Sequence, residues 1–99
     1  MPARIAIDQE RIADFCRHYH IRKLSLFGSV IRDDFTAESD VDVLVEFEPG
    51  KTPGLKFFTM DEELAEILGR KVDLNTAGFL SPYFRDEVLR EAEVVYVTP

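Results

Sequence analysis

The sequence has few basic residues for its length, and this shortage limits the partners that it can bind directly. Its 99 residues include 12 lysines and arginines against 19 aspartates and glutamates, which gives a formal net charge of −7. Binding to long DNA or RNA depends on lysine and arginine contacts that release counterions from the phosphates. The excess of acidic side chains therefore argues against nucleic acid as a direct partner.

The sequence also lacks the long apolar runs and the paired cysteines of membrane and secreted proteins. A membrane-spanning helix needs about 18 consecutive apolar residues, and no stretch of the sequence approaches that length. Asp8 and Glu10 lie where a signal peptide would be uncharged. The single cysteine, Cys16, cannot form a disulfide within the chain and falls in an apolar helical pattern. We expect a cytoplasmic protein without a membrane contact, with Cys16 in its core.

Proline and glycine are concentrated in one short segment, so the sequence offers no boundary between domains. The only stretch rich in both is 49–54, which is too short to separate two domains. Internal repeats and low-complexity segments are absent from the sequence. The 45% of hydrophobic residues is enough for an independent core. We expect residues 1–99 to form a single domain.

The spacing of apolar residues predicts alternating helices and strands. Helical spacing predicts helices over 9 to about 20, 57–68 and 82 to about 90, and a short helical turn at 30–34. Asp8 is the expected N-cap of the first helix, Gly69 is expected to end the second long one, and Ser81 with Pro82 is expected to begin the last. Strands are predicted at 23–27, 41–47, 71–75 and 94–97.

A Gly-Ser pair, Gly28 and Ser29, follows the first predicted strand and precedes the short helical turn. A glycine at such a corner lets backbone N–H groups approach phosphate oxygens without a Cβ in the way. The serine adds a hydroxyl donor, and the start of a helical turn favours negative charge. On its own, however, a Gly-Ser pair is most often an ordinary turn.

Two aspartates, Asp40 and Asp42, follow after ten further residues and begin the next predicted strand. Their i, i+2 spacing places both carboxylates on one face of the strand. Such a pair is usually just a solvated strand face, but Asp73 lies at the centre of the following strand with apolar neighbours that face the other way. Three carboxylates on one sheet face repel unless cations neutralise them. If the two strands are neighbours, the sequence predicts a two-metal site.

Gly28-Ser29, ten residues, Asp40-x-Asp42 and a later strand carboxylate together resemble the signature of the nucleotidyltransferase superfamily that includes DNA polymerase beta. Within it, the chain is similar to the minimal nucleotidyltransferases (MNT), antitoxins that are paired with HEPN-domain ribonuclease toxins. The segments that carry this closer resemblance are SLFGSVIR at 25–32, SDVDVLV at 39–45 and SPYFR at 81–85.

The resemblance implies an α/β fold with a mixed sheet of about four strands and helices packed mainly on one face. It implies ATP as substrate and Mg²⁺ as cofactor, with two ions expected. The nucleotide-binding residues that it indicates are Gly28, Ser29 and Arg32, and the metal-binding and catalytic residues are Asp40, Asp42 and Asp73. Arg32 could equally form a surface ion pair with a neighbouring aspartate.

The activity that the resemblance implies is transfer of AMP from ATP to a tyrosine of the partner toxin, which silences its ribonuclease. Two other interpretations stay open at this point. The chain could neutralise the toxin by binding and occlusion alone, or the acceptor could be a small molecule, as in aminoglycoside nucleotidyltransferases. The lack of a second domain argues against a small-molecule acceptor. We expect the aromatic pairs at 57–58 and 83–84 to belong to the core rather than to an interface.

Overall fold

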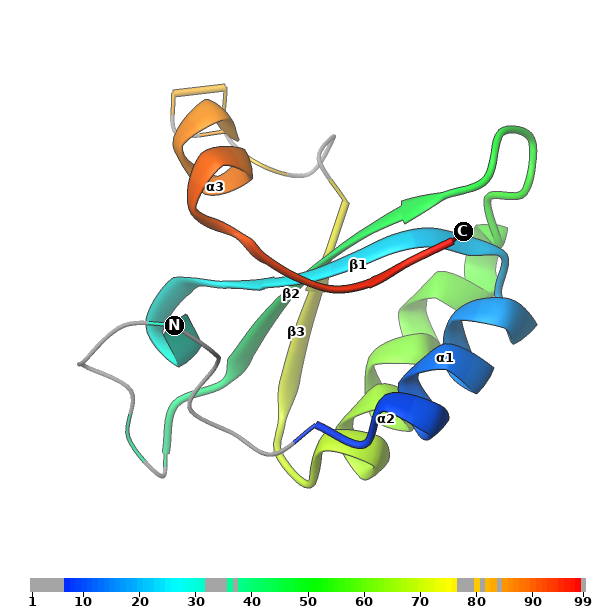
Figure 1. Cartoon of the computed structure of the whole chain (residues 1–99), viewed down its shortest axis with the longest axis horizontal. Coiled ribbons are helices and arrows are strands. Elements are labelled where there is room, and N and C mark those ends of the chain that lie inside the picture. Colours follow the sequence, from blue (N-terminus) through cyan, green and yellow to red (C-terminus); the bar gives the residue numbers. More distant parts are fainter. Residues whose placement is uncertain are drawn as a thin grey trace.

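Four strands form one mixed sheet, and two helices cover one of its faces (Figure 1). The computed structural model describes residues 7–31, 36, 38–76, 80, 82–83 and 85–98. The elements in chain order are α1 (Gln9–His18), β1 (Ile21–Phe27), the 3-10 helix η1 (Gly28–Ile31), β2 (Val41–Phe47), the 3-10 helix η2 (Gly54–Lys56), α2 (Phe57–Leu68), β3 (Val72–Asn75), α3 (Arg85–Glu91) and β4 (Glu93–Val97).

The strand order across the sheet is β3-β2-β1-β4. β1 pairs antiparallel with both β2 and β4, whereas β2 and β3 pair in parallel. A parallel pair needs a crossover connection, and α2 supplies it between β2 and β3. α1 packs beside α2, and α3 lies away from both in Figure 1. The predicted mixed sheet of about four strands with helices mainly on one face is confirmed.

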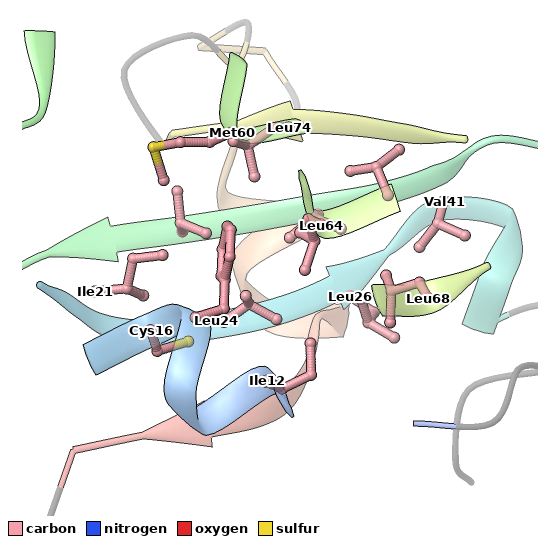
Figure 2. Packing of buried hydrophobic residues seen from close by; sticks show 14 of the residues in the cluster. Ile12, Cys16, Ile21, Leu24, Leu26, Val41, Met60, Leu64, Leu68 and Leu74 are labelled. Carbon is pink, nitrogen blue, oxygen red and sulfur yellow. The ribbon is translucent and has the colours of Figure 1, made fainter. Parts of the chain in front are cut away.

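The core lies between the sheet and the pair formed by α1 and α2 (Figure 2). Alternate residues of β2 face it, because successive side chains of a strand point to opposite faces. Its fully buried members include Ile12 and Cys16 of α1, Leu24 and Leu26 of β1, Val41, Val43 and Val45 of β2, and Met60 and Leu64 of α2. Burial of one such aliphatic side chain stabilises the fold by about 1.5–3 kcal/mol. This packing holds the central strands in one register.

The helix ends confirm several sequence signals. The Asp8 carboxylate accepts a hydrogen bond from the backbone N–H of Arg11 over 3.2 Å, as an N-cap does. Gly69 adopts a left-handed conformation with φ 71° at the end of α2 and donates to the Ala65 carbonyl. His20, just after α1, has φ 58° although it is not glycine. No helix in the described part of the chain is both long and apolar enough to cross a bilayer.

The start of the last helix was predicted too early. α3 begins at Arg85, while Pro82 and Tyr83 lie in a turn and Ser81 falls outside the described residues. The Arg85 guanidinium donates to the Leu80 carbonyl oxygen over 3.1 Å across this turn. Proline fixes a φ angle that suits a turn as well as a first helical turn, so the sequence signal was ambiguous.

The expectation that the aromatic pairs are core residues is wrong for two of the four. Phe57 is half-buried against the core, but Phe58 is 69% exposed and Tyr83 is 98% exposed. Successive helical residues point about 100° apart, so Phe58 cannot share the inward direction of its neighbour. Phe84 lies outside the described residues.

Cys16 is fully buried, and its burial raises the pKa of the thiol from 9.0 to about 12. We expect a thiol reagent at pH 8 to label the native protein far more slowly than the protein in guanidinium, since only the thiolate reacts. Because the thiol pKa is higher in the folded than in the unfolded protein, the contribution of this group to the stability of the folded state is complete below pH 9. The free energy of unfolding should therefore fall as the pH rises from about 9 toward 12, by at most about 1.4 kcal/mol per pH unit from this group.

Urea titrations at several pH values measure this dependence, with Cys16→Ala as the control. The variant should lose less stability over the same range. Its residual loss comes from Tyr19, whose pKa is raised to about 12, chiefly by its hydrogen bond to the Glu63 carboxylate. Equal labelling of native and unfolded wild type would contradict the prediction.

Candidate functional site

The Gly-Ser corner forms where β1 ends. Phe27 is the last residue of the strand, and Gly28 turns the chain into η1 with φ 75°. This left-handed conformation is one that glycine adopts without the steric cost of a Cβ. Gly28 and Ser29 are both half-buried. The corner is thus presented at the end of a strand that the core holds in place.

The carboxylate of Asp42 lies directly against this corner. Phe27 and Asp42 are paired across the antiparallel β1 and β2, so Asp42 is placed beside the residue that precedes Gly28. A Cβ added to Gly28 would overlap Oδ2 of Asp42 and would lie 3.1 Å from its Cγ. Any side chain at position 28 would have to displace the Asp42 carboxylate, in addition to adopting a φ angle that favours glycine. The structure therefore joins the Gly-Ser pair and the second motif aspartate into one site.

Asp73 reaches the same region from the other side of Asp42. In the parallel pairing of β2 and β3, Asp42 and Asp73 are direct partners. The residues on either side of Asp73, Val72 and Leu74, are buried while Asp73 is exposed. Both aspartates thus lie on the sheet face opposite the helical core. The sequence-based condition for a shared site, that the two strands be neighbours, is met.

Asp40 stands one residue before β2 and is exposed. Asp40 is two residues before Asp42, a spacing at which side chains of an extended chain point to the same face. The backbone N–H of the intervening Val41 donates to the Lys71 carbonyl oxygen over 2.9 Å, which fixes the start of the parallel pair. Arg32, the further nucleotide-binding residue expected from the sequence, lies outside the described residues.

The site is chemically suited to Mg²⁺ bound together with a phosphate ligand. Carboxylate oxygens are the hard donors that this ion prefers, and proteins usually hold it by one or two of them with substrate phosphates and waters. Within the described ranges, no group of three His, Cys, Asp or Glu side chains is arranged to hold a metal ion, so Asp40, Asp42 and Asp73 are not brought together as a complete metal site. The Gly28 corner, which a Cβ would fill, leaves backbone next to the Asp42 carboxylate. This donor set fits an ion that also needs ligands from its substrate.

A shallow hollow beside Asp73 was not foreseen from the sequence. It is lined by Phe57, Phe58 and Asp61 of α2 with Asp73 and Leu74 of β3, and has a volume of about 190 Å³. A larger hollow of about 480 Å³ lies between α1 and α2, without any of the motif aspartates in its walls. The signal for the smaller one was the aromatic pair at 57–58, which we had assigned to the core.

A family model described as polymerase beta, nucleotidyltransferase matches residues 10–99. The chain belongs to this family. Among curated relatives, the protein adenylyltransferase MntA of Thermococcus cleftensis is 41% identical over 80 residues, which cover 80% of this chain and 77% of that protein. The resemblance to nucleotidyltransferases inferred from the motifs is confirmed.

Solved structures with a similar fold include a protein described as a nucleotidyltransferase and chains of toxin-antitoxin complexes. A protein provisionally described as a minimal nucleotidyltransferase is 36% identical, with a TM-score of 0.69 over 85% of each chain. A toxin-antitoxin complex with AMP-PNP contains a chain with a TM-score of 0.72 and 20% identity, covering 93% of this chain and 75% of that one. The complex of a tri-AMPylated Shewanella oneidensis HEPN toxin with an MNT antitoxin contains a chain with a TM-score of 0.63 and 21% identity. The match covers 91% of this chain and 70% of that one.

The close approach of Gly28 and Asp42 predicts how Gly28→Ala will behave. A methyl group there must displace the Asp42 carboxylate, so we expect at least a tenfold loss of ATP affinity, measured by calorimetry. Gly50→Ala is a matched control, because Gly50 has nearly the same φ, 76°, but no atom within 4 Å of an added Cβ. Gly50→Ala should cost only the left-handed strain of about 1–2 kcal/mol in stability. Equal ATP affinities in the two variants would contradict this account.

Proposed function

We propose that this chain is an Mg²⁺-dependent protein adenylyltransferase that transfers AMP from ATP to a tyrosine of a HEPN-type ribonuclease toxin and so inactivates it. The observation that carries the proposal is the contact of the Gly28 corner with Asp42, which has Asp73 as its register partner. It joins a phosphate-binding corner to the carboxylates. The adenylyltransferase relative at 41% identity and the fold shared with an antitoxin bound to an AMPylated toxin support the choice of reaction and partner.

The corner would hold the triphosphate of ATP. Backbone N–H groups at Gly28 and Ser29, together with the serine hydroxyl, are suitable donors to phosphate oxygens, because no Cβ blocks the approach at Gly28. We assign Arg32 a further contact to the nucleotide on the basis of its place after the Gly-Ser pair. The fold shared with a complex that contains AMP-PNP supports an adenine nucleotide as the ligand.

Asp40, Asp42 and Asp73 would hold the metal only together with the phosphates of ATP, because the three carboxylates do not form a complete metal site by themselves. When bound there, Mg²⁺ offsets the charge of the phosphates and lowers the pKa of an attacking hydroxyl. The chain's own contribution is to fix the carboxylates before substrate arrives, since Asp42 and Asp73 sit on adjacent strands anchored by buried neighbours. The net charge of −7 is compatible with ATP binding if Mg²⁺ binds together with ATP, because the cations supply the positive charge that the protein lacks.

The reaction is an in-line displacement at the α-phosphorus of ATP. A bond forms between the acceptor oxygen and the α-phosphorus, the bond from that phosphorus to the bridging oxygen breaks, and pyrophosphate leaves. We assign Asp73 the role of accepting the acceptor's proton, and its exposure beside the half-buried Asp42 supports this assignment. The residues act mainly by positioning the reactants, as is general for phosphoryl transfer. We place the reaction in the cytoplasm, where ATP and an intracellular ribonuclease are both present.

The metal assignment predicts that ATP binding depends on both Mg²⁺ and Asp42. In calorimetric titrations, wild type should bind ATP more tightly with Mg²⁺ than without it. Asp42→Asn should lose most of that difference, since the amide keeps the size but not the charge of the carboxylate. The same titration on Glu46→Gln, a half-buried carboxylate further along β2, serves as the control. Equal affinities in wild type and Asp42→Asn, with and without Mg²⁺, would remove the metal from the mechanism.

The role of Asp73 distinguishes catalysis from occlusion. We expect Asp73→Asn to lower the rate of AMP transfer at least about a hundredfold, because a metal ligand and proton acceptor is lost. Binding of the partner should be largely retained. Intact-mass spectrometry of the HEPN protein after incubation with ATP measures transfer, and a pull-down measures binding. An unmodified partner with wild type would refute the proposed activity, and full protection of cells by Asp73→Asn would show that occlusion suffices.

A further inference from the structure

The hollow beside Asp73 has an aromatic side chain in its wall, Phe58, that is mostly exposed. Phe57 packs against the core, and its ring meets that of Phe47 at 6.3 Å between centroids. Phe58 makes an edge-to-face contact with Phe57, at 5.9 Å and 89°, and is otherwise 69% exposed. The exposed Phe58 ring, held against the half-buried Phe57, gives the hollow an apolar wall that an aromatic side chain of a partner can contact.

The size of the hollow limits what it can receive. Its volume of about 190 Å³ is below the roughly 300–1,000 Å³ that is usual for small-molecule pockets. A single side chain of another protein is a better match than a nucleotide or an antibiotic. The walls that Phe57 and Phe58 provide favour a planar ring, because aromatic pairs gain from stacked or edge-to-face geometry.

The charge of the hollow adds a second restriction. Asp61 and Asp73 both line it, and among the residues that the structure describes no lysine or arginine lines it. A partner that covered these carboxylates without bringing a positive charge would have to bury them uncompensated, which is costly. The occupant therefore needs a lysine or an arginine near its ring.

We propose that this hollow is the acceptor site, and that it takes a tyrosine flanked by a basic residue in the partner protein. Phe58 contacts the ring and Asp61 faces the basic side chain. Asp73, on the edge strand β3, borders both the hollow and the sheet face that carries Asp42, so the phenolic oxygen must reach the Asp73 carboxylate around that edge. The inference rests on the proposed adenylyltransferase function and adds to it the residues that select the acceptor. On this proposal Phe58 and Asp61 act on acceptor binding and not on nucleotide binding.

The test compares Phe58→Ala, Phe58→Tyr and Asp61→Asn with wild type. Initial rates of AMP incorporation into the HEPN partner are measured by intact mass over a range of partner concentrations. Phe58→Ala should lower kcat/KM at least tenfold, mainly through a higher KM for the partner. Phe58→Tyr should stay within about threefold of wild type, because it keeps the ring. Asp61→Asn should lower kcat/KM about threefold or more, with a weaker dependence on salt than wild type shows.

Two controls share the segment but do not line the hollow. Leu55→Ala removes an apolar side chain that is 85% exposed, and Glu62→Gln removes the charge next to Asp61. Both should transfer AMP within about twofold of wild type. The affinity for ATP, measured by calorimetry, should be unchanged in every variant.

The outcomes separate this inference from the proposed function. No transfer by wild type refutes the proposed function and the inference with it. Normal transfer by Phe58→Ala and Asp61→Asn refutes the inference alone. An equal loss in Leu55→Ala would also overturn it, because the segment would then act as a general apolar patch. A loss of ATP affinity that parallels the loss of transfer would assign the hollow to the nucleotide instead.

Discussion

The register between β2 and β3 determines whether this chain has a site at all. Val41 and Val43 pair with Val72 and Leu74 on the buried face, so the residues between them, Asp42 and Asp73, must share the other face. A slip of one residue in β3 would turn Asp73 into the core, at a cost that an unpaired buried carboxylate makes prohibitive. The same apolar contacts that stabilise the domain therefore place the two carboxylates side by side.

This placement brings two negatively charged side chains, Asp42 and Asp73, close to each other. Two carboxylates on adjacent strands repel, and a cation bound between them would relieve that repulsion. The half-buried Asp42 carboxylate lies directly against the Gly28 backbone at the end of β1. Groups held in place before their ligand arrives are typical of functional sites. A bound nucleotide with its metal should consequently stabilise the whole domain.

The sequence predicted the fold and the carboxylates because both depend on strong periodic signals. Apolar residues alternate clearly with polar ones in β2 and β3. This alternation alone puts Asp42 and Asp73 on the faces of their strands that point away from the core, whatever the strand pairing. The start of α3 was predicted wrongly because Pro82 suits a turn and a helix start equally. The prediction that Phe58 belongs to the core was wrong because it rested on the apolar character of phenylalanine alone. The direction of the side chain depends on how α2 is rotated against the sheet, and Phe58 is exposed. The contact of Gly28 with Asp42 is tertiary and could not be read from either segment alone.

The small volume of the hollow next to Asp73 favours a protein as the second substrate that we propose. At about 190 Å³ this hollow is too small to enclose a drug-sized molecule. An acceptor that must be oriented within fractions of an ångström therefore has to bring most of its own binding surface. A folded partner can do so, since contacts spread over a wide interface orient a single inserted side chain. On this view the exposed Phe58 and the two carboxylates beside it form only the centre of a site that the partner completes.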